Sequence, residues 1–366
     1  MTGRTGPLAG IRIIEIDAIG PVPLAAMILA DMGADIIRVA RAASAGAGAW
    51  EDVGGDILHR SRDLLHLNLK DADDRESLFA LIDRADALIE GFRPGVMERL
   101  GLGPDACLAR NPRLVFGRMT GWGQSGPLAQ RAGHDINYLS ITGALHAMGT
   151  ADAPPPVPLN LVGDYGGGAM FLIAGLLAAI LSAQRTGQGQ VVDACISDGT
   201  ASLMSLFYAW QPKGLWQDAP ASNLLDGAAP FYRCYRCADG RDVAVGCLEP
   251  QFFAQMVRGL GLEHRRYDQN DRAGWPAMEA DFADMFATRT RDEWAAHFAD
   301  SDACVTPVLS MVEAPRHPHN DARRSFVQRG GIPQPAPAPR TLGTPPSISE
   351  PALLSVAQAV ARWGGC

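Results

Sequence analysis

The sequence predicts an α/β protein, with a large Rossmann-like domain built on a mostly parallel sheet and a smaller α+β domain after it. Three observations support this fold class. An apolar strand, an apolar helix and a second strand follow one another between residues 11 and 40. The alternation of strands and helices continues to about residue 120. After residue 225 the pattern changes to a hairpin followed by helices.

The first βαβ unit is the clearest part of the pattern. Residues 11–16 (IRIIEI) are predicted to form a buried strand, and PVPLAAMILADMG is predicted to form an apolar helix with proline near its start. A strand over 35–40 completes the unit. Further strands are expected over 66–70, 87–90 and 114–119, and an amphipathic helix over 73–85 with Leu78, Leu81 and Ile82 on one face.

The second half of the chain has a different character. A proline-rich loop over 151–158 precedes a long apolar helix, a strand over 190–196 and a helix over 198–210. Asp239-Gly240 is predicted to turn a hairpin within 230–250, and two or three helices follow to about residue 298. The predicted limits are 1–190 for the large domain, 191–224 for a helical linker, 225–310 for the small α+β domain and 311–366 for a C-terminal segment. The proline-rich part of that last segment is either a strap back to the first domain or a linker.

The composition excludes several classes of protein. The 366 residues are 47% hydrophobic and 20% charged, with a net charge of −8, which argues against a nucleic-acid scaffold because such a protein needs a basic field. The longest apolar run, residues 169–183, is too short to span a membrane. The first residues lack the apolar core of a signal peptide, and RWGGC is not a peroxisomal address. Seven scattered cysteines, an odd number, argue against a disulfide framework, so we expect a cytoplasmic protein.

Three familiar motifs are incomplete or absent. Residues 121–126 match G-x-G-x-x-G after a strand, but Pro127 and a polar stretch follow instead of a helix. We therefore favour a glycine-rich turn lining another pocket over a nicotinamide site. Cys234 and Cys237 have the spacing of a redox or zinc motif, but no second pair lies nearby, so no metal site is expected. No Gly-x-Ser-x-Gly elbow supports a serine hydrolase.

Several basic residues fall at or just after predicted strand ends. They are Arg38, Arg41, Lys70, Arg93 and Arg99. Open α/β sheets bind ligands at the carboxyl ends of their strands, so these residues suggest an anionic ligand such as a phosphate. Ordinary solvated surface explains about half of them equally well.

Two further motifs each have a structural and a chemical interpretation. His134 beside Asp135 is more often a structural pair than a catalytic one, and Asp164 before the long helix is an ordinary N-cap. Three glycines, residues 166–168, are harder to explain structurally, because each weakens a helix by ~1 kcal/mol. A bare backbone there suggests the close approach of a ligand, with main-chain N–H groups facing a developing negative charge.

Taken together, several ordered motifs resemble the α-methylacyl-CoA racemases of the family III CoA-transferase superfamily. They are MTGWGQSGP, AGHDINY, PLNLVGDYGGGAMFLIAGLLAAI, GQGQVVDA, CADGRDVAVG, EPQFF and SDACVTPVL. The resemblance runs from about Gly6 to Ser310. It implies a large Rossmann-like CoA-binding domain, a smaller domain, a C-terminal segment that returns to the large domain and a homodimer of two interlocked subunits.

The resemblance also implies residue roles. His134 and Asp164 would be the two acid/base residues, with Glu249 bonded to His134 and Asn160 supporting Asp164. Tyr232 would lie near the acyl pocket. The residues that resemble CoA contacts are Arg41, Leu67, Asn68, Leu69, Lys70, Gly91, Phe92, Arg93, Arg99, Gly133, Asp135, Ile136, Asn137 and Tyr138. No separate cofactor is implied, since CoA is part of the substrate.

The histidine decides between two reaction classes. CoA-transferases resembling this chain use an aspartate at the position of Asp164 as a nucleophile and carry a non-basic residue where His134 stands. A histidine supplies a second base, so we expect racemisation of a 2-methylacyl-CoA thioester, with a CoA-transferase as the alternative and a non-enzymatic CoA-binding protein as a distant third. The resemblance leaves the acyl group open among bile-acid, branched fatty-acid, steroid and arylpropionyl thioesters.

The expected chemistry requires two groups of similar acidity on opposite faces of one carbon. Reference pKa values are ~6.5 for histidine and ~3.9 for aspartate, so the pocket must narrow the gap. Burial raises the pKa of an aspartate, whereas a position at a helix N-terminus lowers it. We hypothesise that desolvation under the acyl chain dominates at Asp164, and we expect enolate donors among the N–H groups of Asp164 and the following glycines. Met170 and some other methionines are further candidates, for the acyl channel, although core packing explains most of them.

Overall fold

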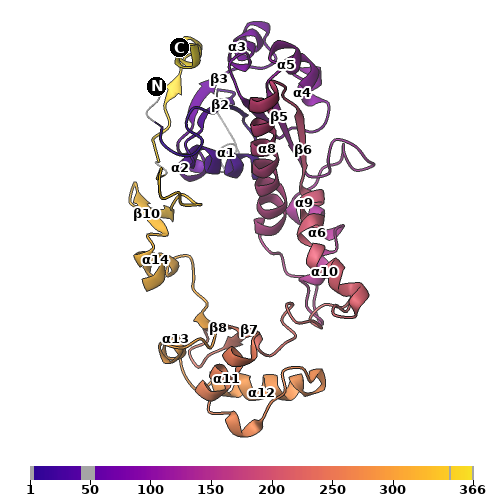
Figure 1. Ribbon diagram of the computed structural model, residues 1–366, viewed down its shortest axis with the longest axis vertical. Helices are drawn as coiled ribbons and strands as arrows, with labels where there is room; N and C mark the ends of the chain where they lie inside the picture. The colour runs from indigo at the N-terminus through magenta and orange to yellow at the C-terminus, as the bar shows by residue number, and fades with distance from the viewer. Residues whose placement is uncertain (1–3, 43–53, 346–347, 365–366) are drawn as a thin grey trace. The chain divides into compact units, whose positions relative to one another are not determined.

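The computed structural model describes residues 4–42, 54–345 and 348–364. The chain forms two compact units (Figure 1). The first unit comprises Met1–Ala144, Val157–Met204 and Gln334–Cys366, and the second comprises Leu145–Pro156 and Ser205–Pro333. These limits differ from the expected 190, 224 and 310, because residues 191–204 pack with the first unit and residues 311–333 with the second.

A seven-stranded parallel sheet forms the centre of the first unit, which confirms the predicted fold class. Its strand order is β12-β3-β2-β1-β4-β5-β6. The strands are β1 (Arg12–Ile16), β2 (Asp35–Ala40), β3 (Asp63–His66), β4 (Ala87–Glu90), β5 (Val115–Thr120), β6 (Val191–Cys195) and β12 (Leu353–Leu354). The order reverses between β1 and β4, so a ligand crevice is expected at the carboxyl ends of these two strands.

One predicted strand is wrong in position. The strand expected over 66–70 is β3, which pairs with β2 from Asp63 to His66. Leu67 is still buried, but at Asn68 the chain turns: Asp74 Oδ2 accepts the N–H of Asn68 at 2.7 Å. Asp71 then caps α3 (Ala72–Ile82) by accepting the N–H groups of Asp73 and Asp74. Residues 67–70 therefore follow the strand and are not part of it.

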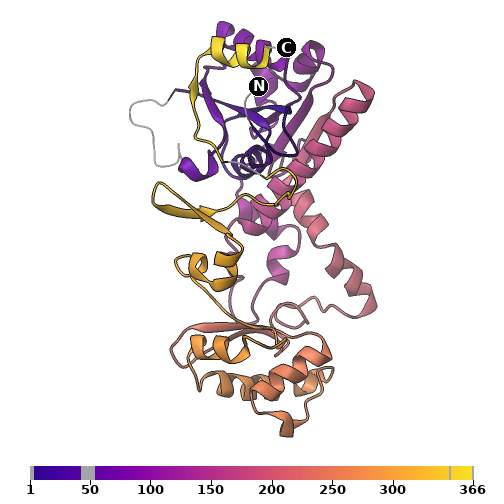
Figure 2. The same cartoon turned by 60° about the vertical axis from the view of Figure 1, so that its left-hand side comes forward.

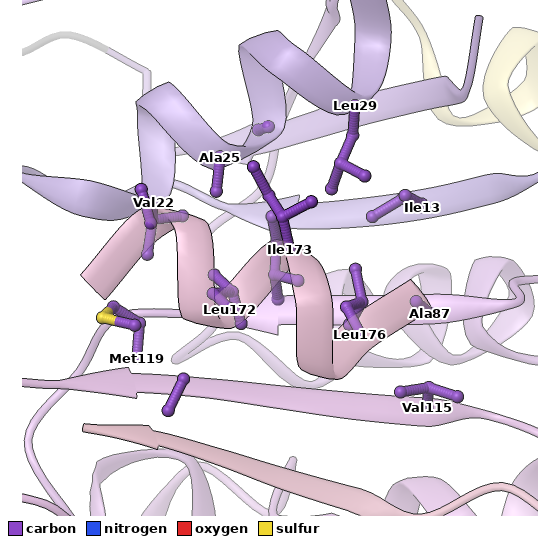
Figure 3. Packing of buried hydrophobic residues seen from close by; sticks show 14 of the residues in the cluster. Ile13, Val22, Ala25, Leu29, Ala87, Val115, Met119, Leu172, Ile173 and Leu176 are labelled. Atoms are coloured by element: carbon purple, nitrogen blue, oxygen red, sulfur yellow. The ribbon is translucent and has the colours of Figure 1, made fainter. Parts of the chain in front are cut away.

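Helices cover both faces of the sheet. On one face, α1 (Pro21–Asp31) and α8 (Met170–Thr186) pack together over the sheet. In Figure 3, Leu172, Ile173 and Leu176 of α8 lie between the side chains of α1 and those of the strands. The other face is covered by α3, α5 (Pro104–Arg110) and α15 (Val356–Gly364). Burying each large aliphatic side chain stabilises the fold by about 1.5–3 kcal/mol, so both layers hold the sheet firmly.

The long apolar helix begins earlier than expected. A π-helix, η1 (Leu161–Ala169), runs directly into α8, and together they form one helix over Leu161–Thr186. By length and composition this helix is apolar enough to cross a membrane. However, Leu172, Leu176 and Ile180 are buried in the core beside the sheet, so the helix has the packing of a core element.

The C-terminal segment completes the first unit. β12 pairs in parallel with β3, and α15 packs beside α3 (Figure 2). Arg362 forms ion pairs with Asp35 and Asp63, at the amino ends of β2 and β3, and the indole N–H of Trp363 donates to Asp35 at 3.0 Å. Both carboxylates are nearly buried. Ion pairs as well as apolar contacts therefore hold the C-terminal segment against the sheet.

Replacing Arg362 by alanine is expected to lower the free energy of unfolding by about 2 kcal/mol, because two nearly buried carboxylates lose their nearer cation and are left with Arg4, at 3.7 Å from Asp35 and 3.4 Å from Asp63. The urea midpoint measures the change. Arg110→Ala is the matched control, since Arg110 pairs with Glu76 and Asp83 on the exposed surface. Equal midpoint shifts for the two variants would contradict the role given to Arg362.

The second unit has its own sheet and core. β7 (Tyr232–Arg236), β8 (Asp242–Gly246) and β9 (Val305–Pro307) are antiparallel, and the predicted turn at Asp239-Gly240 joins β7 to β8. Gly240 has a φ of 74°, which explains glycine at this position. The core packs this sheet against α11 (Pro250–Gly259), α12 (Trp275–Phe286) and α13 (Arg291–Phe298).

Shorter elements complete the description. They are α2 (Gly55–Leu58), α4 (Val96–Arg99), α6 (Asp135–Ser140), α7 (Ala144–Ala147), α9 (Ile196–Leu203), α10 (Ser205–Trp210), η2 (Gln211–Lys213), η3 (Glu263–Arg265), η4 (Arg272–Gly274), η5 (Ala314–Arg316), α14 (Pro318–Ala322), β10 (Phe326–Arg329) and β11 (Ile332–Pro335). The helix expected over 198–210 is thus divided into α9 and α10. Of the two spaced cysteines, Cys234 is exposed and Cys237 is buried in the core of the second unit.

Candidate functional site

The loops after β1, β4 and β5 meet at the carboxyl edge of the sheet. Gly20, directly before α1, has a φ of 77°, and a Cβ atom there would lie 3.5 Å from Oδ2 of Asp164. A Cβ at Gly91, directly after β4, would lie 3.0 Å from the methyl carbon of Ala18 in the loop after β1. Asp164 therefore lies beside the point where the strand order reverses, which is the expected position of a ligand crevice.

Asp164 is not the N-cap that the sequence suggested. Asn160 is the N-cap of η1, and Asp164 lies inside the π-helix. Asn160 makes no capping hydrogen bond with its side chain. Its amide instead bonds to the carboxyl group of Asp164, where it lowers the pKa of that group. This contact agrees with the supporting role expected for Asn160. π-helical turns occur frequently at functional sites, which fits this position.

Burial raises the pKa of Asp164 to about 6 and is the largest influence on it. The carboxylate of Asp135 raises the pKa further, whereas the Asn160 hydrogen bond and the charge of His134 lower it. Burial by the protein itself is thus already the largest influence, and the N-cap effect that opposed it is absent, whereas the desolvation expected under the acyl chain stays a prediction. An aspartate with a pKa of about 6 can both accept and release a proton near neutral pH.

The structure brings His134 close enough to Asp164 for their charges to interact. His134 is the N-cap of α6, and its main-chain N–H donates to Oδ1 of Asn137 at 3.1 Å. The imidazole is exposed. The two residues expected to act as acid and base therefore belong to one site, one on the first turn of α6 and the other in η1.

Of the three glycines after Asp164, Gly167 lies against a neighbouring helix. A Cβ at Gly167 would lie 2.5 Å from Oγ1 of Thr200 in α9. A Cβ at Gly199, also in α9, would lie 1.9 Å from the main-chain oxygen of Gly167. The missing side chain of Gly167 allows η1 and α9 to approach closely, so a neighbouring helix is sufficient to explain this glycine.

The N–H group of Asp164 is also engaged. It donates to Oδ1 of Asp135 at 2.6 Å, so it is not the enolate donor that the sequence analysis expected.

The glycine-rich turn over 121–126 packs against an aromatic ring. A Cβ at Gly121 would lie 2.0 Å from the ring of Tyr138, and the ring of Trp122 meets that of Tyr138 edge-on at 4.7 Å. The hydroxyl of Tyr138 donates to the main-chain oxygen of Gly133. The next helix, α6, begins only at Asp135. The turn therefore lacks the helix that a dinucleotide fingerprint requires, and Tyr138 is buried beneath it.

Of the five basic residues expected at or just after strand ends, four lie there and are exposed. Arg41, Lys70, Arg93 and Arg99 are exposed at or after the carboxyl ends of β2, β3 and β4. Arg38 differs, because it lies inside β2 and approaches Asp17 at 3.7 Å.

The other predicted CoA contacts divide by exposure. Asn68, Gly91 and Asn137 are exposed, Leu69, Phe92, Gly133 and Ile136 are partly exposed, and Leu67, Asp135 and Tyr138 are buried.

Arg118, Glu90 and Glu98 form a network of ion pairs that was not predicted from the sequence. The network holds residues 90–98, the segment that contains Arg93 and leads to Arg99. Glu90, completely buried at the end of β4, accepts from Arg118 Nε at 3.0 Å and from the N–H of Phe92 at 2.7 Å. Arg118 also pairs with Glu98 in α4 at 2.7 Å. The available signal was an arginine inside the apolar strand VFGRMT, since buried charges require partners. The network fixes both ends of this segment.

Glu249 and Tyr232 belong to the second unit. Glu249 is the N-cap of α11, and Tyr232 begins β7. Tyr232, Cys234, Gly246, Cys304 and Thr306 line a pocket of about 480 Å³ beside the small sheet. The bond between Glu249 and His134 and the place of Tyr232 near an acyl chain stay predictions. Among the residues that the structure describes, no group of three or more His, Cys, Asp or Glu side chains is placed to hold a metal ion.

Comparisons with known proteins show the family and the fold of the chain. Residues 8–353 match the sequence model of CoA-transferase family III. The chain is 43% identical over 351 residues to the alpha-methylacyl-CoA racemase of Mus musculus, covering 94% of this chain and 90% of that protein. It is 43% identical over 341 residues to that of Homo sapiens, covering 92% and 87%. A CAIB/BAIF family protein from Brucella suis shares the fold, with a TM-score of 0.82 at 21% identity and 99% of each chain covered.

Proposed function

The chain belongs to CoA-transferase family III, and from this membership we propose that it is a racemase that interconverts the (R) and (S) forms of 2-methylacyl-CoA thioesters. The observation that carries the proposal is the pairing of His134 with Asp164, whose pKa burial raises to about 6. Two such groups supply the two proton-transfer partners that racemisation needs. A CoA-transferase needs only the carboxyl group, as a nucleophile.

The proposed reaction moves one proton off the α-carbon and another onto it. The first group takes the α-hydrogen as a proton, and the electron pair of the broken C–H bond forms the enolate, with its charge on the thioester oxygen. The second group then donates a proton to the opposite face of the same carbon. The enzyme ends with the two protonation states exchanged, so the two enantiomers use opposite starting states. Glu249 is proposed to support His134, and Asn160 to support Asp164.

The exposed cations at the carboxyl edge are the proposed partners of the CoA phosphates. Arg41, Lys70, Arg93 and Arg99 are exposed and follow the carboxyl ends of β2, β3 and β4, and arginine and lysine are the usual ligands of phosphate groups. The pocket of about 480 Å³ beside Tyr232 has the size and partly apolar lining suited to an acyl chain. No separate cofactor takes part in the proposed reaction.

We also propose the homodimer that the resemblance implied. Leu161, Met170, Leu181 and Leu203 are large apolar residues of η1, α8 and α9, and each has more than 40% of its surface exposed. Such apolar surface is suited to a partner subunit. We place the protein in the cytoplasm, as expected, because Cys107, Cys195, Cys234, Cys237, Cys247 and Cys304 are free thiols, which a reducing compartment allows.

Incubation with a pure enantiomer of a 2-methylacyl-CoA in deuterated water tests the proposal. We expect deuterium at the α-carbon and loss of optical purity without any added acceptor, measured by mass spectrometry and chiral chromatography. Transfer of CoA to an added carboxylate, with a hydroxylamine-trapped anhydride and no α-exchange, would instead establish a transferase. Binding without either reaction would exclude both enzymes.

A further inference from the structure

We infer that Asp135 is a positioning residue for Asp164. Its carboxylate holds the N-terminal end of η1 in place and puts an uncompensated negative charge beside the reacting carboxyl group of Asp164. This inference rests on the proposed function for its catalytic consequence. Its structural basis is independent of that function. The sequence resemblance had assigned Asp135 to CoA contacts instead.

The first argument concerns main-chain hydrogen bonds. The first N–H groups of a helix have no partner inside the helix and usually bond to the side chain of the N-cap residue. In η1 the side chain of Asn160 does not do this. Asp135, from α6, accepts the N–H of Asp164 at 2.6 Å and also that of Gly163. A residue 29 positions earlier therefore caps the helix, and the amide of Asn160 is left to bond with the carboxyl group of Asp164.

The second argument concerns space. Asp135 is 7% exposed, and its Oδ1 lies against the main chain of η1. A Cβ at Gly163 would lie 2.4 Å from Oδ1, a distance at which one of the two atoms must move. Gly163 is therefore required for the contact, although its φ is one that other residues adopt. A methyl group at Gly163 is predicted to displace the carboxylate without any change to Asp135 itself.

The third argument concerns charge. Oδ2 of Asp135 is buried and, within the described part of the chain, has no hydrogen-bond partner. The influences on the pKa of Asp135 are burial and two main-chain N–H groups, with no cation among them. Three titratable groups interact electrostatically with Asp164: Asp135, His134 and the phenol of Tyr138. His134 is the N-cap of α6, and the other two residues lie within it. Among the described residues that lie against the glycines of η1 or against Asp164, Gly20, Pro21, Met119, Ile196, Thr200 and Leu203 are uncharged.

Asp135→Asn separates the two effects, because asparagine keeps the accepting oxygen and loses the charge. We expect the titration of Asp164 to move to lower pH by on the order of 0.5–1 unit, since a neighbouring like charge is removed. Two measurements report it: the pH dependence of α-hydrogen exchange, and the ¹³C resonance of the Asp164 carboxyl group, assigned by its loss in Asp164→Asn. Asp193→Asn is the matched control, because Asp193 also accepts a main-chain N–H, from Gln124 at 3.2 Å, and is not among the influences on Asp164.

Gly163→Ala tests the positioning role. We expect at least a tenfold loss in kcat with a much smaller change in KM, because the reacting carboxyl group is displaced while the cations after β2, β3 and β4 are untouched. An unchanged titration of Asp164 in Asp135→Asn, or wild-type kcat in Gly163→Ala, would overturn the inference. If the wild-type protein exchanges no α-hydrogen, the proposed function fails, and the ¹³C titration then decides the inference alone. The same Asp164 pKa in the wild-type protein and in Asp135→Asn rejects the inference, and a lower pKa in Asp135→Asn supports it.

Discussion

Replacing Asp164 by asparagine is expected to lower racemisation by roughly 10³-fold in both directions, and to lower α-hydrogen exchange by a similar factor for the enantiomer whose hydrogen faces Asp164, because the amide neither accepts nor releases a proton in this range. Asparagine has nearly the same shape, so the contacts with Asn160 and with the main chain before α1 are largely retained. Exchange is measured by mass spectrometry of the thioester in deuterated water. Thermal unfolding at the wild-type temperature would show that the loss is chemical.

The wild-type pH dependence sharpens this prediction. The pKa of Asp164 is about 6, so the carboxylate form becomes populated as pH rises through that value. Exchange in the direction that uses Asp164 as the base should therefore increase through about pH 6 and level off above it. A rise centred near pH 4, the value for an exposed aspartate, would contradict the burial effect at this site. Wild-type racemisation in Asp164→Asn would remove the residue from the mechanism.

Replacing His134 by alanine is expected to abolish α-hydrogen exchange from at least one enantiomer. One face of the α-carbon then has no proton donor or acceptor, whereas Asp164 still serves the other face. The enantiomer whose hydrogen faces Asp164 can retain exchange without racemisation. This asymmetry is the expected signature of two separate groups, and chiral analysis of the recovered thioester measures it.

His134→Asn provides a second variant with a neutral polar side chain at the start of α6. Asparagine is a favourable N-cap, so helix stability is preserved while the titrating imidazole is lost. Both variants should lose exchange from the same enantiomer. Full racemase activity in either one would refute the assignment of His134.

The sequence allowed a good prediction of the elements whose signal is local. The strands over 35–40 and 87–90 have the predicted bounds, because each is a short apolar run between polar turns. The hairpin at Asp239-Gly240 also forms as predicted, since the residue pair itself favours the turn. The strand placed over 66–70 was displaced by three residues, because pairing with β2, and not local composition, decides where β3 begins and ends.

For the candidate site, the sequence named residues but not their surroundings. His134, Asp164 and Asn160 could be named from their motifs, and the structure brings them to one site. The N-cap assignment of Asp164 was wrong because the helix begins four residues earlier, at Asn160. Arg118 and its two glutamates were missed, since an isolated arginine in a strand says nothing about which carboxylates it meets across the sheet.

Local patterns in the sequence indicated the parallel α/β class and the long apolar helix, because periodicity and turn residues are read within a few positions. The resemblance to a known family named His134 and Asp164 as the proposed proton-transfer groups. The folded chain showed which N–H groups are engaged, how burial changes the acidity of Asp164 and what lies against the glycines that follow it. Those properties depend on burial and on close contact between distant segments, such as Asp135 with Asp164 and Gly167 with Gly199. No local pattern encodes them, because they arise only when the segments have packed.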